Sequence, residues 1–475
     1  MKGSDRRTDA ACPRPAARDS LYTPVRVVDL DLDEPSGLRS PGGSGAADPE
    51  GRVLALVRLH GHPLGLVTAT GTAGATAALR RALVDAAHRE LHVPALSTAT
   101  PAARPSRVAR ARVPAGPVTV SVVVCTRDRT ESLRSCLDSL LRTGYPHTEV
   151  LVVDNAPRDD ATERLVAARY RDRVRYLREP VPGLARARNR GLAAAGGEVV
   201  AFADDDLIID AGWVEAIART FGADDRIACV TGLVLPAELE TPAQVALEQY
   251  GGYSRGFAAR DWSLRLQPDD PLVRFSVGRF GSGANMAFRT AVVRGFGGFD
   301  PATGAGTPAR GGEELLAFFQ TLDTGHTVAY QPDAIVWHRH PRTADALGRQ
   351  VFNFGVGFGA YLTAAVARRP GVLLELARRV PGGLRQWQRV RRDRARCGPA
   401  GRELAQLRLG RRELGGMLVG PFGYAVSVWR QRGWDTGGRV APARDDTGRD
   451  DTGRVRGGRD DAGQAGGGQV DGGAS

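Results

Sequence analysis

The sequence predicts an α/β protein with a mixed, mainly parallel sheet flanked by helices, a small N-terminal α+β domain and a helical C-terminal extension. Between residues 118 and 204, apolar strands alternate with helical patterns, which is the order of βαβ units. The first of these strands, 118–125, is apolar at nearly every position, as in strands that are covered on both faces. A chain of 475 residues that is 42% hydrophobic can bury a core of this size.

Changes in composition divide the chain into six segments. Residues 1–20 are polar and rich in Pro and Arg, and the glycine-rich tail 433–475 has almost no apolar residues, so we expect both to be disordered. Residues 96–117 are rich in Pro, Ala and Arg, as is typical of a linker. The other predicted segments are a small domain at 21–95, the main α/β domain at 118–342 and a basic helical extension at 343–432.

The small N-terminal domain is predicted to contain a strand, a hairpin and a helix. The strand is 25–32, the hairpin 53–68 turns near His60, and residues 75–91 carry apolar side chains at helical spacing. The histidines of this domain lack acidic or cysteine partners, which disfavours a metal site there.

In the main domain, each apolar strand is followed by a helical pattern. Thr130 and Glu131 are typical of a helix start, and the leucines from Leu133 onward form the apolar stripe of that helix. This alternation predicts right-handed crossovers. The further strands are predicted at 149–153, 174–177 and 199–203, and the further helices at 161–170 and 184–195.

Three consecutive carboxylates, Asp204, Asp205 and Asp206, end the strand 199–203. Like charges side by side repel one another, so the arrangement makes sense if a divalent cation lies beside them. Mg²⁺ and Mn²⁺ prefer hard oxygen ligands, and open α/β sheets bind ligands beyond the carboxyl ends of their strands. The alternative interpretation is an acidic, solvated turn that caps the next helix.

Seven short motifs follow one another in the main domain, at 122–127, 152–155, 183–191, 202–206, 281–286, 311–314 and 336–340. In order and spacing they resemble the motifs of a family 2 glycosyltransferase of the GT-A fold, an inverting enzyme of the DXD type. The resemblance covers residues 118–342. It implies a hexosyl- or deoxyhexosyl-transferase with a nucleotide-diphosphate-sugar donor, a hydroxyl acceptor and inversion at the anomeric carbon.

A metal ion is expected beside the carboxylates. Displacement at the sugar needs a stabilised diphosphate leaving group, which bound Mn²⁺ or Mg²⁺ provides as a Lewis acid. We expect Asp206 to be the direct ligand and Asp204 to bind the ribose hydroxyls or the metal. In some relatives a histidine at the place of His338 coordinates the metal, and His340 is a spare candidate. The alternative for His338 is a core histidine that is hydrogen-bonded to backbone.

The resemblance also assigns donor-binding residues. Asp154 ends the second strand and would accept from a base N–H or from ribose, although Asp-Asn-Ala-Pro is also good turn sequence. Arg186 and Arg188 point to different faces of a helix, and Arg188 matches the family position that meets the diphosphate. The residues predicted to bind the nucleotide or donor are Thr126, Arg127, Asp154, Arg188, Asn189, Asp204 and Asp205.

The acceptor hydroxyl is a poor nucleophile and needs a general base. In the family this is the second residue of a Glu-Asp pair, which matches Glu314; the longer side chain leaves the choice between Glu313 and Glu314 open. The helix macrodipole explains the same acidic pair as the start of a helix at 315–322. Asn285, in a glycine-rich loop, is expected to face the donor sugar or the acceptor, with a plain turn as the alternative.

Other function classes remain open. A Gln-x-x-Arg-Trp motif, present in processive relatives, is absent between 315 and 345, which favours transfer of one or a few sugars in cell-envelope or secondary glycoconjugate synthesis. The alternatives are a nucleotidyltransferase on a related core and a non-catalytic nucleotide- or lipid-binding module. The first strand lacks a following glycine-rich loop, which disfavours the nucleotidyltransferase. The sequence contains no aromatic-rich RNA motif, so we expect no nucleic acid as a partner.

Composition also bears on location. The five cysteines are scattered, so we expect reduced thiols in a cytoplasmic protein. The formal net charge is +12, and no apolar run reaches the roughly 18 residues of a spanning helix. After residue 343, apolar runs alternate with arginine clusters such as Arg389–Arg396, a pattern typical of interfacial anchors. We therefore expect peripheral contact with the inner face of an anionic plasma membrane and a lipid-linked or glycan acceptor; the alternative is that these helices pack on the main domain.

Overall fold

The computed structural model describes residues 24–34, 37–43, 45–93, 117–268, 270, 272–378 and 408–437. The predictions for residues 1–20, for nearly all of the linker 96–117, for Arg389–Arg396 and for the tail beyond residue 437 lie outside the described residues. The described residues between 24 and 429 belong to one compact unit. The borders of the segments predicted from composition stay predictions.

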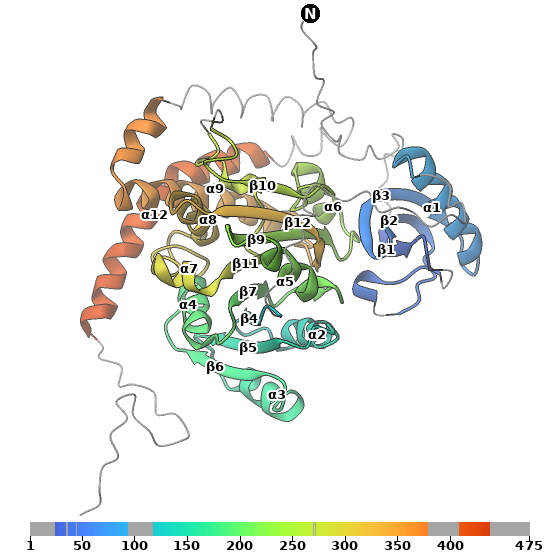
Figure 1. Cartoon of the computed structure of the whole chain (residues 1–475), viewed down its shortest axis with the longest axis horizontal. Coiled ribbons are helices and arrows are strands. Elements are labelled where there is room, and N and C mark those ends of the chain that lie inside the picture. Colours follow the sequence, from blue (N-terminus) through green and yellow to red (C-terminus); the bar gives the residue numbers. More distant parts are fainter. Residues whose placement is uncertain are drawn as a thin grey trace, which may run out of the picture. The chain divides into compact units, whose positions relative to one another are not determined.

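The N-terminal part contains a three-stranded sheet covered by one helix (Figure 1). Its first two strands run parallel, and the second and third form a hairpin that turns at His60 and Gly61. Both turn residues have positive φ, as a two-residue type I′ turn requires. The elements are β1 (Val25–Asp31), the 3₁₀ turn η1 (Pro41–Gly43), β2 (Gly51–Leu59), β3 (His62–Gly71) and α1 (Thr76–Glu90).

The main sheet has nine strands and is mixed, with one half entirely parallel, and a mixed, mainly parallel sheet is what the sequence predicts. Its order is β10-β12-β9-β11-β7-β4-β5-β6, with β8 paired to β12. The strands β7, β4, β5 and β6 are parallel, and β11 lies antiparallel between β7 and β9. The strands are β4 (Val120–Thr126), β5 (Thr148–Asn155), β6 (Arg175–Glu179), β7 (Val199–Asp204), β8 (Leu207–Ile209), β9 (Ile227–Pro236), β10 (Arg260–Trp262), β11 (Asn285–Arg289) and β12 (Thr327–His338).

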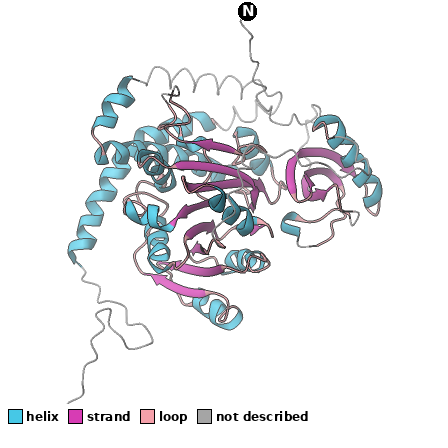
Figure 2. Cartoon of the chain, viewed as in Figure 1, coloured by secondary structure: helices cyan, strands magenta, loops and turns pink. Residues whose placement is uncertain are grey.

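Helices cover both faces of the main sheet (Figure 2). Because side chains alternate along β4, Val122 and Val124 join the core on one face while Val123 packs into the core on the other. The first face carries α2 (Thr130–Leu140), α3 (Ala161–Arg169) and α5 (Trp213–Ala223). The second face carries α4 (Leu184–Ala194), α7 (Thr290–Gly295), α8 (Glu313–Asp323) and α9 (Ala344–Arg368). The remaining elements are α6 (Pro242–Tyr250), η2 (Val277–Arg279) and α12 (Leu409–Gly437).

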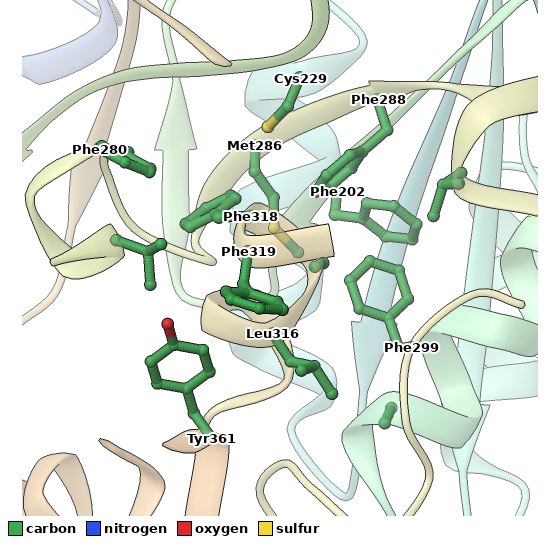
Figure 3. Close-up of a cluster of buried hydrophobic side chains, with 14 of the residues drawn as sticks. Phe202, Cys229, Phe280, Met286, Phe288, Phe299, Leu316, Phe318, Phe319 and Tyr361 are labelled. Atoms are coloured by element: carbon green, nitrogen blue, oxygen red, sulfur yellow. The ribbon is translucent and has the colours of Figure 1, made fainter. Parts of the chain in front are cut away.

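A cluster of aromatic side chains joins α8 to the sheet (Figure 3). Phe318 of α8 stacks on Phe288 of β11, with ring centroids 6.2 Å apart. Phe202 of β7 meets Phe299 edge-on at 5.1 Å. Because Phe202 also meets Phe288 edge-on at 6.5 Å, these rings connect α8 through β11 to β7, and α8 and β7 carry the predicted carboxylate motifs.

Two long C-terminal helices cross at glycines. A Cβ at Gly359 of α9 would lie 2.3 Å from the carbonyl oxygen of Met417, and one at Gly420 of α12 would lie 2.5 Å from the carbonyl oxygen of Val356. Only glycine therefore allows this approach of the two backbones. Among the described residues, α9 is the one helix long and apolar enough to cross a membrane, but half of its most apolar stretch is buried in the protein.

The N-terminal sheet packs on the main sheet and supports the segment behind the carboxylates. Leu56 is buried against Leu235 and Trp337 of β9 and β12. Beside them, the guanidinium of Arg58 lies 2.7 Å from Asp29 and 2.6 Å from Asp210, and all three side chains are nearly inaccessible. Asp210 follows β8, so this buried ion pair holds the chain a few residues after Asp206.

The cysteines among the described residues, Cys125, Cys136 and Cys229, are free and buried.

Candidate active site

The carboxyl ends of three parallel strands meet at one edge of the main sheet. Thr126 at the end of β4 is in register with Asp154 of β5. On the other side of β4, Cys125 is in register with Asp204 of β7. Residues from three separate motifs thus lie side by side, at the edge where open α/β sheets bind their ligands.

Asp154 is buried at this edge. Its Oδ2 accepts a hydrogen bond from the Tyr176 hydroxyl, 3.1 Å away, and its Oδ1 accepts none from any described residue. Burial raises the pKa of the Asp154 carboxyl. A carboxylate with one unused oxygen can accept from a base N–H or a ribose hydroxyl, so the predicted role of Asp154 fits its surroundings.

Asp205 is hydrogen-bonded to the loop that follows β4. Its Oδ2 accepts from the Thr126 hydroxyl at 2.7 Å, and its Oδ1 lies 3.1 Å from Nη1 of Arg129. The same Nη1 lies 3.3 Å from Asp206 Oδ2. The sequence singled out Arg127 in this loop. Both arginines are exposed, but Arg129 meets Asp205 and Asp206, whereas Arg127 lies 3.9 Å from Asp128.

An open cleft of about 580 Å³ lies beside Asp206. The N-terminus of α2, which begins at Thr130, forms one wall, and its free N–H groups and positive dipole favour an anion. Arg129 and Arg339 add positive charge. Neither was predicted to bind the donor; the available signal for Arg339 was its position between two histidines at a strand end. The cleft is lined by Asp128, Arg129, Thr130, Glu131, Ser132, Asp206 and Arg339.

Arg188 connects the two halves of the site. Its Nη1 donates to Glu313 Oε1 at 2.8 Å, and its Nη2 donates to the Gly283 carbonyl at 3.1 Å. The same Nη2 lies 3.5 Å from Asp204 Oδ1. Arg188 is 2% exposed, so its side chain makes its contacts within the protein. The contact between Arg188 and the diphosphate stays a prediction.

Glu313 and Glu314 differ in their surroundings. Glu313 is buried, and Arg188 neutralises it. Glu314 is partly exposed and faces Gly283, where an added Cβ would lie 3.2 Å from the Glu314 Cβ. Burial of its carboxyl and the neighbouring Glu313 charge raise the pKa of Glu314 to about 8, against the lowering effect of Arg188. Glu314 is therefore the carboxyl of the pair that is not committed to an ion pair.

His338, at the end of β12, faces Asp206. Its Nε2 lies 3.5 Å from Asp206 Oδ1, and its Nδ1 lies 3.1 Å from Nδ1 of His340. Nε2 of His340 is in turn 2.7 Å from a carboxylate oxygen of Glu248. Tyr253 packs against both imidazole rings. The sequence pointed to neither Glu248 nor Tyr253, because both lie about ninety residues before the histidines.

This network assigns the protons of the two rings. A carboxylate can only accept, so Nε2 of His340 carries the proton that is donated to Glu248. With both rings neutral, His340 Nδ1 is an acceptor, and His338 Nδ1 must donate to it. His338 Nε2 then presents a lone pair to Asp206. Burial lowers the pKa of His338, which favours this neutral form.

Two predicted site residues, Asn189 and Asn285, use their side-chain amides for hydrogen bonds within the protein. The side-chain amide of Asn189 bonds both backbone groups of Phe299, at 2.8 Å each. Asn285 is buried and accepts from the Trp213 indole at 2.8 Å. Its amide nitrogen donates to backbone carbonyls at 2.8 and 3.1 Å. For both asparagines the structure thus favours a role in holding neighbouring segments together, rather than contact with a ligand.

Asp206 and His338 fit a divalent cation. Asp206 Oδ1 is buried and accepts no hydrogen bond from the described residues, and it faces the His338 lone pair. Two acceptors facing each other are stabilised by a cation between them. The described residues hold no group of three or more His, Cys, Asp or Glu side chains arranged for a metal ion. Such a site suits an ion that takes its remaining ligands from water and substrate phosphates.

In comparison with known proteins, residues 121–296 match the model of a sequence family described as glycosyl transferase family 2. A pre-mycofactocin glycosyltransferase of Mycobacterium tuberculosis is 28% identical over 253 residues, which are 52% of this chain and 49% of that protein. A glucosyl-dolichyl phosphate glucuronosyltransferase of Haloferax volcanii is 27% identical over 233 residues, 46% of this chain and 69% of that protein. The chain thus spans about half the length of the first relative.

Among solved structures, a mannosyltransferase from Pyrobaculum calidifontis in complex with GDP-Man and Mn²⁺ is similar, with a TM-score of 0.41 and 19% sequence identity. The similarity covers 70% of this chain and 91% of that one.

Proposed function

We propose that this chain, whose residues 121–296 match the glycosyl transferase family 2 model, transfers a sugar from a nucleotide-diphosphate-sugar to an acceptor hydroxyl with inversion. The observation that carries the proposal is the position of Arg188. One buried guanidinium lies 3.5 Å from Asp204 of the donor-side motif and 2.8 Å from Glu313 of the acceptor-side motif. Two carboxylate motifs far apart in sequence therefore form one site.

On the donor side, the chain offers a nucleotide site along the strand ends. Asp154 would accept from the base or ribose, and Thr126 and Asp205 hold the loop that follows β4. Arg129, Arg339 and the start of α2 border the anionic part of the donor. Asp206 and His338 would hold Mn²⁺ or Mg²⁺, and the imidazole nitrogen favours Mn²⁺ because Mg²⁺ prefers oxygen ligands alone. The bound ion would neutralise the departing diphosphate as a Lewis acid.

On the acceptor side, Glu314 is the proposed general base. Its carboxylate takes the proton of the acceptor hydroxyl while that oxygen bonds to the anomeric carbon. The bond from the anomeric carbon to the phosphate oxygen breaks, and the nucleoside diphosphate leaves on the opposite face, which inverts the configuration. A pKa raised to about 8 makes Glu314 a stronger base than an ordinary carboxylate.

The acceptor is proposed to be a lipid-linked or glycan hydroxyl, and transfer to be non-processive. The name of the Haloferax volcanii relative contains glucosyl-dolichyl phosphate, a sugar linked to a lipid phosphate, which supports this class. Cell-envelope or secondary glycoconjugate synthesis is the corresponding proposed role.

Sugar release and transfer assays with a panel of UDP- and GDP-sugars test the proposal. We expect turnover of one donor class with Mn²⁺, none after chelation by EDTA, and none in Asp206→Asn, because the amide loses the charge that holds the cation. Full activity in EDTA would contradict metal dependence. Binding of every donor without turnover in any condition would favour a non-catalytic module, and release of pyrophosphate from nucleoside triphosphates would favour a nucleotidyltransferase.

A further inference from the structure

One face of α12 carries an exposed apolar stripe. Leu418 is 76% exposed, Phe422 75% and Trp429 72%, and Leu414 continues the line at 43%. Their spacing of four, four and seven residues places them within one narrow sector of a helix with 3.6 residues per turn. From Leu414 to Trp429 the stripe extends about 23 Å at the helical rise per residue. Largely exposed Leu, Phe and Trp side chains in a row on one helix are unusual for a surface that faces only water.

The opposite face of α12 is firmly packed. Tyr424 donates to Asp300 Oδ2 at 3.1 Å, and the backbone N–H of Ala309 donates to the Ser427 hydroxyl at 3.3 Å. A Cβ at Gly423 would lie 2.6 Å from the Pro308 carbonyl oxygen. The helix is therefore held on the loop that leads to Glu313, and its apolar stripe points outward because the inner face is already occupied.

The charges around the stripe have one sign. Arg408, Arg411 and Arg412 are exposed at the start of the helix. Glu413, the single acidic residue between 408 and 429, is hydrogen-bonded to the Tyr250 hydroxyl. The sequence places Arg430 directly after Trp429. An apolar stripe with cationic ends matches the surface of a bilayer that contains anionic lipid.

We propose that α12 docks this protein on an anionic membrane surface, with Leu414, Leu418, Phe422 and Trp429 inserted at the level of the acyl boundary. A second copy of the chain is the weaker occupant, since a two-fold contact along this stripe would bring the exposed arginines of both copies together. Docking would hold the acceptor-side loop 300–312 close to the bilayer. The sequence pointed to the region 345–430; within its described residues we place the contact on the outer face of α12, because half of the most apolar stretch of α9 is buried in the protein.

Vesicle flotation of the full chain tests this. We expect it to float with phosphatidylcholine vesicles that contain phosphatidylglycerol at low salt, to detach as salt rises, and to ignore vesicles of phosphatidylcholine alone. The double variant Leu418→Gln/Phe422→Gln should bind the anionic vesicles about a hundredfold more weakly, which corresponds to about 2.8 kcal/mol. Arg408→Gln/Arg411→Gln should bind about tenfold more weakly and depend less on salt.

Leu266→Gln is the matched control, because Leu266 is 57% exposed and belongs to the segment after β10 rather than to α12; it should float like the unaltered protein. Thermal unfolding followed by circular dichroism checks that all variants keep their fold, as expected for exposed positions. The proposal is overturned if the unaltered protein stays in the dense fraction with anionic vesicles at low salt. It is also overturned if light scattering finds a dimer that Leu418→Gln/Phe422→Gln dissociates, or if Leu266→Gln lowers binding as much as the double variant.

Discussion

Asp206 Oδ1 and His338 Nε2 lie 3.5 Å apart, and the hydrogen-bond network directs a lone pair from each atom toward the other. Asp206 lies in the turn between β7 and β8, and β8 pairs with β12, where His338 is in register with Leu207. What makes the pair suited to a cation is a third residue, Glu248, which fixes the proton positions of both histidines through His340. Carboxylate partners of this kind commonly orient metal-binding imidazoles.

Glu248→Gln is expected to lower the affinity for Mn²⁺ by about 10- to 100-fold. The glutamine amide can donate to His340, which would reverse the proton positions in both rings and place a proton on His338 Nε2. Titration calorimetry with Mn²⁺ alone measures this without turnover. Glu240→Gln makes the same change at an exposed ion pair with Arg26 and should leave Mn²⁺ affinity unchanged. Equal affinities in both variants would contradict the assignment.

Glu314→Gln and Glu313→Gln should have different effects. We expect Glu314→Gln to keep the fold and donor binding and to lower kcat by about 10² or more, because the general base is lost. Glu313→Gln leaves the buried Arg188 charge without its partner and should lower the free energy of unfolding by about 3 kcal/mol. Steady-state kinetics and urea unfolding of both variants separate these outcomes. If Glu313→Gln alone loses turnover while staying stable, the two roles are reversed.

The pKa of Glu314, raised to about 8, predicts a pH dependence. The base must be ionised, so kcat/KM should rise as pH increases through about 8, whereas a carboxyl at its ordinary value would already be ionised at pH 7. For stability the sign is opposite: the folded protein binds the proton more tightly than the unfolded chain, so stability present near pH 4.5 is lost as pH approaches 8.

Rate profiles and unfolding curves of the unaltered protein and Glu314→Gln, recorded side by side, test both signs. The stability difference between the two proteins should change across this pH range, since the amide does not titrate. A flat kcat/KM profile from neutral to alkaline pH would show that Glu314 is not the titrating base.

Arg58→Met should lower the free energy of unfolding by about 3 to 5 kcal/mol. The substitution leaves Asp29 and Asp210 buried without their cation, which costs far more than an exposed ion pair is worth. Arg26→Met breaks an exposed pair with Glu240 and should cost about 1 kcal/mol or less. Chemical unfolding of both variants is the measurement. Equal, small losses would mean that the N-terminal sheet does not support the segment that follows the carboxylates.

Local patterns in the sequence determined the elements around the site. Apolar runs and helical spacing predict β4, α2, β5, α4 and β7 within a few residues, because these patterns follow from the alternation of side chains in strands and the turn of a helix. The same patterns place Thr126, Asp154 and Asp204 at strand ends. Parallel strands bring those ends to one edge, so this part of the site could be predicted without coordinates.

Tertiary packing decided which of the polar side chains face a ligand. Arg188 and Asn189 are consecutive on α4, yet one joins two carboxylate motifs and the other bonds the backbone of Phe299. Glu248 joins the site through a contact with His340 across the fold, and no local spacing indicates it. The outward stripe of α12 likewise depends on the loop that occupies its inner face. Sequence periodicity reports the local conformation of each element, whereas the partner of each face depends on how distant segments pack together.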